Sequence, residues 1–92
     1  MKLVLVATGD VYVCLVDGRG RRLVDGQTLT AGQRTRRFTA RRLLANFGTA
    51  NVRMRVNGKT YPVAASANPV GYELRPGRKP RRLPDAQRPS CA

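Results

Sequence analysis

Apolar and polar residues alternate over short stretches in the first 74 residues of the chain, and glycines interrupt the alternation at intervals of about ten residues. A period of two places successive side chains on opposite faces of a β-strand, and the glycines mark turns between strands. Strands of this length at this spacing are typical of all-β sandwiches and barrels. The pattern therefore predicts one all-β domain over residues 1–74.

The first two predicted strands are the most apolar parts of the chain. They cover Leu3–Ala7 and Val11–Val16, and both are rich in valine, which suits a pleated, packed surface. The stretch Val11–Val16 has no polar face, so we expect it at the centre of a sheet and covered on both sides. After it we expect short strands over Arg21–Val24 and Gln27–Thr30, separated by a turn at Asp25-Gly26.

The clearest local signal is a hairpin centred on Asn57-Gly58. A two-residue type I′ turn needs positive φ at both central positions, which asparagine and glycine tolerate better than other residues. The turn fixes the register of the flanking strands, so that Met54 faces Tyr61 on the core side. Pro62 has no N–H to donate, so we expect the second strand at a sheet edge or with a bulge.

The segment Thr39–Gly48 is compatible with two structures. Thr39 would be the N-cap of a short helix that ends at Gly48, and the residues between them favour a helix. A strand from Arg42 to Phe47 fits the segment equally well. The segment is too short for propensity to decide between the two.

The composition changes at Arg75. Residues 75–92 contain four prolines, six basic residues and one acidic residue, with few apolar side chains to bury. A segment of this kind cannot offset its ordering entropy by forming a core. We therefore expect a flexible basic C-terminal tail over residues 75–92, after the domain at residues 1–74.

The chain has 18 Lys and Arg residues, 5 Asp and Glu residues and no histidine, which gives a net charge of +13. The absence of histidine excludes Ser-His-Asp and Cys-His catalysis and zinc sites that use histidine. The five acidic residues are scattered, which disfavours a paired-carboxylate hydrolase or a two-metal site. We therefore expect a non-enzymatic protein without catalytic residues, metal site or cofactor.

Arginines are concentrated in the middle of the chain. Seven lie between residues 34 and 55: Arg34, Arg36, Arg37, Arg41, Arg42, Arg53 and Arg55. If their segments pair as neighbouring strands, these side chains form a basic stripe that can hold phosphates or carboxylates. The alternative is a solvated outer sheet face, on which arginine stems cover apolar surface and their charges protect the edges.

A strongly basic chain can also bind nucleic acid through its phosphates. The three tyrosines and two phenylalanines form no interleaved stacking pattern, and no recognition helix is predicted. From the residues alone, we therefore expect only non-specific binding of nucleic acid.

The two cysteines lie far apart in the sequence. Cys14 is in an apolar predicted strand, and Cys91 is near the end of the tail. In the cytosol both would be free thiols. In an oxidising compartment a Cys14–Cys91 disulfide would hold the tail across the sheet and stabilise the fold by roughly 4–5 kcal/mol on the chain-entropy treatment. The sequence leaves both states open.

Four turn motifs follow one another along the chain. They are Asp17–Gly20, Leu29–Gly32, Phe47-Gly48 and Val56–Lys59. Their order and spacing, over residues 3–74, resemble the C-terminal domain of the RodZ family. The resemblance implies an immunoglobulin-like antiparallel β-sandwich of about seven short strands, and it implies a strand rather than a helix over residues 42–47.

Proteins of the RodZ family carry a cytoplasmic helix-turn-helix domain that binds the actin-like filament protein MreB, one transmembrane helix, and this β-rich domain outside the cytoplasm. They help to set bacterial cell shape by linking the filament to cell-wall synthesis. The resemblance implies a non-enzymatic extracytoplasmic binding domain, anchored through an upstream membrane helix, that presents its basic sheet face to an acidic envelope component or wall-synthesis protein. Binding of MreB would belong to a domain outside this chain.

Two other functions fit the residues. The chain would alternatively be a cytoplasmic basic β-barrel that binds RNA or single-stranded DNA, with both cysteines as free thiols. It would otherwise be a folded spacer without a ligand. A hydrophobic span encoded upstream of Met1 would favour the RodZ-like function over both.

Overall fold

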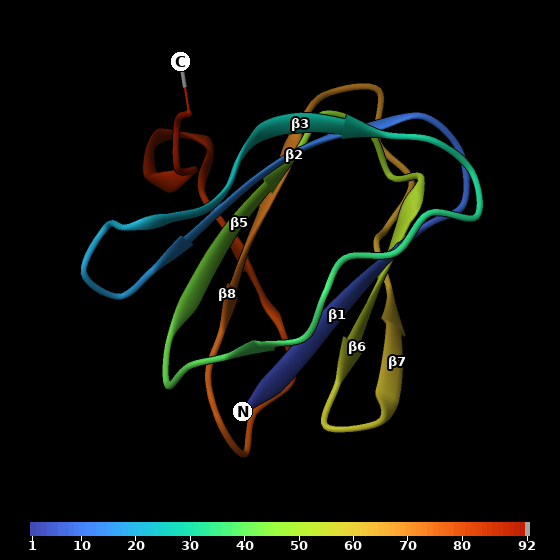
Figure 1. Ribbon diagram of the computed structural model, residues 1–92. Helices are drawn as coiled ribbons and strands as arrows, with labels where there is room; N and C mark the ends of the chain where they lie inside the picture. Colours follow the sequence, from blue (N-terminus) through green and yellow to red (C-terminus); the bar gives the residue numbers. More distant parts are fainter. Residues whose placement is uncertain (92) are drawn as a thin grey trace.

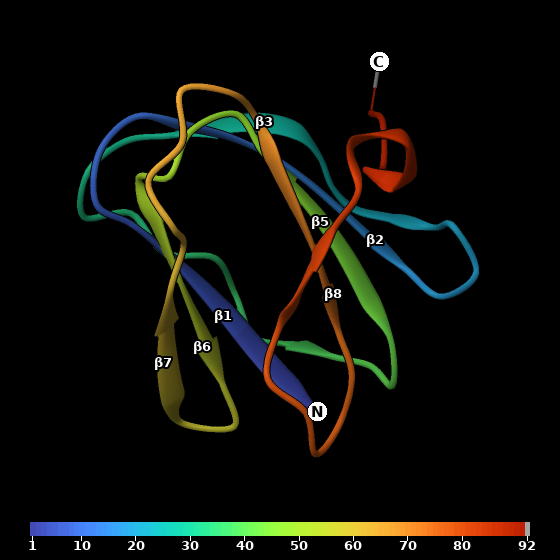
Figure 2. The same ribbon diagram turned by 180° about the vertical axis from the view of Figure 1, so that it is seen from behind.

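The computed structural model describes residues 1–91 and consists of two antiparallel β-sheets packed face to face (Figures 1 and 2). One sheet has four strands in the order β4-β1-β6-β7, and the other has five in the order β3-β2-β5-β8-β9. The elements are β1 (Lys2–Ala7), β2 (Val11–Asp17), β3 (Arg22–Leu29), β4 (Phe38–Thr39), β5 (Leu43–Phe47), β6 (Val52–Val56), β7 (Lys59–Pro62), β8 (Val70–Leu74), β9 (Arg81–Leu83) and the 3-10 helix η1 (Asp85–Gln87). The all-β, sandwich-like fold is as predicted, with nine strands in the described residues instead of about seven.

The core lies between the two sheets and is built mainly from alternate residues of five strands, with Val24, Phe38 and Val63 at its margins. The buried wall residues are Leu3, Leu5, Ala7, Val52, Met54 and Val56 on one sheet, and Val11, Val13, Leu15, Leu43, Ala45, Phe47, Val70, Tyr72 and Leu74 on the other. Because successive side chains point to opposite faces, the intervening residues of β1 and β6 point outward. Lys2, Arg53 and Arg55 are therefore exposed on the outer face of the four-stranded sheet.

The β6-β7 hairpin has the predicted turn and register. Asn57 and Gly58 have φ angles of 50° and 83°, and Met54 faces Tyr61 across the two strands. β7 is the last strand of its sheet, as predicted from Pro62. The side of β7 on which this proline lacks an N–H therefore faces no other strand, and no interstrand hydrogen bond is lost.

The hairpin turn gives a first test of the fold. Replacing Gly58 with alanine should lower the free energy of unfolding by about 1 kcal/mol, because a residue with a Cβ is strained at positive φ. No atom outside residues 57–59 lies within 4 Å of the position that this Cβ would take, so the cost comes from the local backbone conformation. Urea unfolding measures the effect. An unchanged midpoint would contradict a type I′ turn at this position.

The segment that fitted both a helix and a strand forms β5. This strand lies between β2 and β8 and pairs with both of them. The pairing partners are distant in sequence, so local propensity carries no information about them.

β2 is central, as predicted, with β3 and β5 on its two sides. On the outer side of this strand, Cys14 and Val16 are buried while Tyr12 is exposed. The expectation that both faces are covered is therefore correct for only part of the strand.

β3 is a single strand where two strands and a turn at Asp25-Gly26 were expected. Gly26 has a φ of 66°, and the register of β3 against β2 shifts between Val13 and Leu15. A positive φ together with a register shift indicates a β-bulge. The glycine therefore bends the strand and does not reverse the chain.

The expectation of a flexible tail over residues 75–92 is wrong for the described residues. β9 pairs with β8 and buries Leu83, which extends the sheet by one strand. Residues 84–91, here called the C-terminal strap, then return over the outer face of the five-stranded sheet (Figures 1 and 2). Composition alone could not predict this, because the segment is ordered by partners elsewhere in the chain.

The strap follows one row of residues across the sheet. The row consists of Cα partners on β2, β5, β8 and β9: Cys14, Asn46, Gly71 and Leu83. Cys14 is joined to Cys91 by a disulfide, and the amide oxygen of Asn46 accepts a hydrogen bond from Arg88. A Cβ at Gly71 would lie 2.5 Å from the Arg88 Cγ, so glycine leaves the space that this side chain occupies.

Candidate anion-binding face

The seven arginines predicted to form one stripe fall into two sets. Four lie over the outer face of the four-stranded sheet: Arg34, Arg37, Arg53 and Arg55. The other three lie away from this face: Arg36, Arg41 and Arg42. The single stripe is therefore reduced to four arginines. Lys2 extends this set, and these five residues are called the cationic face below.

A groove of about 570 Å³ runs along β1 on the cationic face. Its floor is formed by the half-buried side chains of Val4 and Val6, which point outward between the core residues of the strand. Arg34 and Arg37 line it from the segment before β4, and Arg55 lines it from β6. The groove thus has an apolar floor with cations on both long sides.

The register explains this arrangement. Val4 pairs with Arg55, and Val6 pairs with Arg53 on one side and with Arg34 on the other. Partners in a ladder point to the same face of a sheet, so each outward valine has an arginine beside it. Lys2 lies near the hairpin turn, where its backbone N–H donates to the Asn57 side chain over 2.8 Å.

The positive charge of the cationic face is not compensated within residues 1–91. All six ion pairs that the structure contains in this range involve arginines outside the face. No acidic side chain lines the groove. An anion that enters the groove therefore meets several guanidinium groups without displacing a carboxylate.

Arg42 directly precedes β5 and is bound to a carboxylate of β8, its neighbour in the five-stranded sheet. Its Nε donates to Glu73 Oε2 over 2.9 Å, and Arg75 and Arg81 contact the same carboxylate. Glu73 is buried, and the hydrogen bonds from Arg81 and Arg42 lower its pKa to about 2. The predicted anion-binding role of Arg42 is thus replaced by a structural ion pair.

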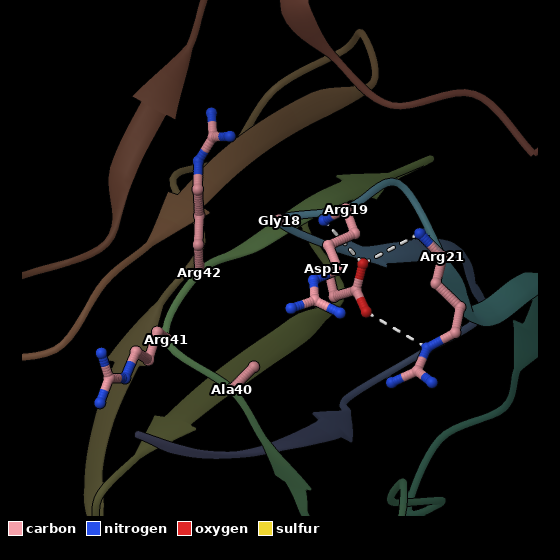
Figure 3. Close-up of a pocket in the computed structure, with 7 residues that line it drawn as sticks. All are labelled: Asp17, Gly18, Arg19, Arg21, Ala40, Arg41 and Arg42. Atoms are coloured by element: carbon pink, nitrogen blue, oxygen red, sulfur yellow. Dashed lines mark hydrogen bonds and ion pairs between the residues drawn. The ribbon is translucent and has the colours of Figure 1, made fainter.

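A second hollow, of about 580 Å³, lies beside the turn between β2 and β3 (Figure 3). Asp17 lines it, accepting backbone hydrogen bonds from Arg19 and Arg21 and pairing with the Arg21 guanidinium at 3.2 Å. These contacts, led by the backbone hydrogen bond from Arg21, lower the pKa of Asp17. Figure 3 shows Arg41 and Arg42 extending away from this carboxylate.

Because a carboxylate lines this hollow and would repel an anion, it is a poorer anion site than the groove along β1. Arg36 also has a partner, since its guanidinium lies 4.6 Å from the centre of the Phe38 ring. This cation–π contact covers a core aromatic residue at the edge of the sandwich.

Sequence reasoning missed five residues of the groove: three from β1, and Asn57 and Gly58 from the hairpin turn. Lys2, Val4 and Val6 belong to a strand whose buried side was recognised, while its outward residues were not considered. The two-residue period of a strand would have identified them, because it places residues 2, 4 and 6 on one face. Their proximity to Arg34 and Arg55 depends on strand order, which the sequence does not reveal.

No group of His, Cys, Asp and Glu side chains suited to a metal ion occurs within residues 1–91. The same part of the chain has no helix with the length and apolar character needed to cross a bilayer. Comparison of this chain with protein-family models, curated proteins and solved structures gave no match.

Proposed function

We propose that this protein is a non-enzymatic binding domain that holds an acidic partner on its cationic face. The observation that carries the proposal is the set of five outward cations with no acidic side chain in the groove between them. The strands fix the backbone at Lys2, Arg53 and Arg55, so less backbone entropy is lost on binding than in a flexible basic tail. Arginine is suited to this role because its planar group binds phosphate or carboxylate with two hydrogen bonds.

We also propose that the domain acts outside the cytoplasm, as the immunoglobulin-like outer domain of a RodZ-like membrane-anchored cell-shape protein. The Cys14–Cys91 disulfide supports an oxidising location, because such bonds are rare in the reducing cytosol. The sandwich-like fold and the turn motifs support the RodZ-like assignment. In such a protein the acidic partner is an envelope component or a wall-synthesis protein, while MreB binding and membrane anchoring belong to other segments.

The alternative of a cytoplasmic β-barrel that binds RNA or single-stranded DNA receives less support. None of the groove-lining residues is aromatic, so a base has no ring to stack on. Alkylation of the unreduced protein followed by intact-mass measurement separates the two locations. Alkylation of both thiols would support the cytoplasmic alternative. A protein in which neither cysteine is alkylated would support the extracytoplasmic proposal.

A double charge reversal tests the binding proposal. The variant Arg53→Glu/Arg55→Glu should weaken binding to a polyanion roughly 10- to 100-fold at about 0.15 M salt, since each basic residue near an anionic surface contributes on the order of 1 kcal/mol. Affinity for poly-L-glutamate and for a phosphate polymer is measured by titration calorimetry. Circular dichroism confirms that the variant is folded.

The matched control is Arg19→Glu/Arg82→Glu, which changes the net charge equally. Both side chains are exposed, form no ion pair within residues 1–91, and lie outside the groove. If the control weakens binding as much as the test variant does, the polyanion is attracted by the net charge of the protein and not by the cationic face. The domain would then be better described as a spacer.

A further inference from the structure

We propose that the groove along β1 takes a linear polyol-phosphate polymer, in which phosphodiesters alternate with short carbon chains. The inference rests on the proposed function and names the chemical class of the acidic partner. It follows from three features of the groove: cations on both long sides, an apolar floor, and a lining without acidic or aromatic residues.

The distribution of cations favours an extended anion over a small one. Arg34 and Arg37 lie on one side of Val4 and Val6, and Arg55 lies on the other. Outward residues on one strand are separated by about 7 Å, so Arg53, the partner of Val6, continues the row of cations on the Arg55 side. A single phosphate can satisfy only the nearest of these groups, whereas a chain of phosphates along β1 contacts successive ones.

The floor disfavours a peptide. A bound acidic peptide would place its backbone N–H and C=O groups over Val4 and Val6, which offer no hydrogen-bonding atoms in their side chains. A buried backbone group without a partner costs binding energy. Neither strand edge of β1 is open, because β6 pairs along one and backbone groups of residues 33–35 bond along the other. A peptide therefore cannot recover those bonds by adding a strand.

The apolar floor also favours a polyol phosphate over inorganic polyphosphate. Inorganic polyphosphate has no carbon, so it gains nothing from covering Val4 and Val6. In a polyol phosphate, the methylene groups between phosphates can lie on these valines while the phosphates reach the arginines on either side. Burial of these methylenes adds to the electrostatic attraction. Nucleic acid has sugars in the same place, but its bases lack an aromatic partner here.

The experiment compares four polyanions of similar chain length: poly(glycerol phosphate), inorganic polyphosphate, poly-L-glutamate and oligo(dT). The first variant, Arg34→Gln/Arg55→Gln, removes one cation from each side of the groove, and Arg19→Gln/Arg82→Gln is its control. The groove variant should weaken poly(glycerol phosphate) binding about 10-fold more than the control does. Its log–log salt slope should fall by roughly one per arginine lost.

The second variant, Val4→Thr/Val6→Thr, keeps the charge and the β-branched shape but makes the floor polar. It should weaken poly(glycerol phosphate) binding about 5-fold and leave inorganic polyphosphate unchanged. Equal affinities of wild type and this variant for poly(glycerol phosphate) would overturn the assignment. So would a preference for poly-L-glutamate or oligo(dT) that depends on Arg34 and Arg55.

The proposed function would survive those last results, because an acidic partner would still occupy the cationic face. It fails if the groove variant binds every polyanion as tightly as its control does, or if the charge reversal at Arg53 and Arg55 has no more effect than its own control. The two proposals therefore fail under different outcomes.

Discussion

Replacing Cys91 with serine should lower the free energy of unfolding by about 4–5 kcal/mol. The disulfide to Cys14 spans a sequence separation of 77 residues, and it removes conformations from the unfolded chain that serine would restore. A small domain has a total stability of about 5–15 kcal/mol, so this loss is a large part of it. Cys91 is the better position to change, because Cys14 is fully buried and a serine there would add a polar group to the sheet.

Guanidinium unfolding of the oxidised wild type and of Cys91→Ser measures the difference. Reduction of the wild type, followed by alkylation of Cys91, should give a similar loss. Arg88→Ala serves as a control that weakens the strap without opening the covalent link, and its effect should be near 1 kcal/mol. A Cys91→Ser protein as stable as the oxidised wild type would contradict a structural role for the bond.

The parts of the fold that the sequence predicted well are those decided by neighbouring residues. The turn at Asn57-Gly58 fixed the register of its hairpin, and Pro62 correctly placed β7 at an edge. The apolar runs in β1 and β2 are strands because burial and β-branching agree within each run. In each case the evidence lies within a few residues of the feature.

The errors concern features that depend on distant partners. Gly26 was interpreted as a turn residue. Residues on both sides of it pair with β2, so the chain forms a bulge there and does not reverse. Residues 81–83 have little to bury by themselves, yet the free edge of β8 accepts them as a strand. The strap is held by Asn46 and Cys14, to which no local pattern connects it.

The candidate site shows the same division. Its arginines were found from composition, and the outward direction of Arg53 and Arg55 follows from the hairpin. Strand order decides which of the seven arginines lie together on the cationic face. It brings Arg34 and Arg55 to either side of β1. In the five-stranded sheet it brings Arg42, next to β5, beside Glu73 on β8.

Glu73 and its three arginines should make stability depend on pH in the acid range. The carboxylate accepts hydrogen bonds from Arg81 and Arg42 at 2.9 Å each, and Arg75 lies at 3.4 Å. Its pKa falls from 4.5 to about 2, so the folded protein holds the charged form more strongly than the unfolded chain does. The resulting stabilisation is fully present above about pH 4.5 and is lost as the pH falls toward 2.

The variant Glu73→Gln should therefore be less stable than wild type by about 2 kcal/mol at neutral pH, and the difference should vanish near pH 2. The expected loss is moderate because the arginine side chains are 42–60% exposed and water screens their charges. Urea unfolding at several pH values measures it. Asp25→Asn is the matched control, since this carboxylate pairs with Arg22 while 63% exposed and should contribute less than about 0.5 kcal/mol. A Glu73→Gln deficit that persists unchanged at pH 2 would show that lost packing, and not the charge of the carboxylate, causes it.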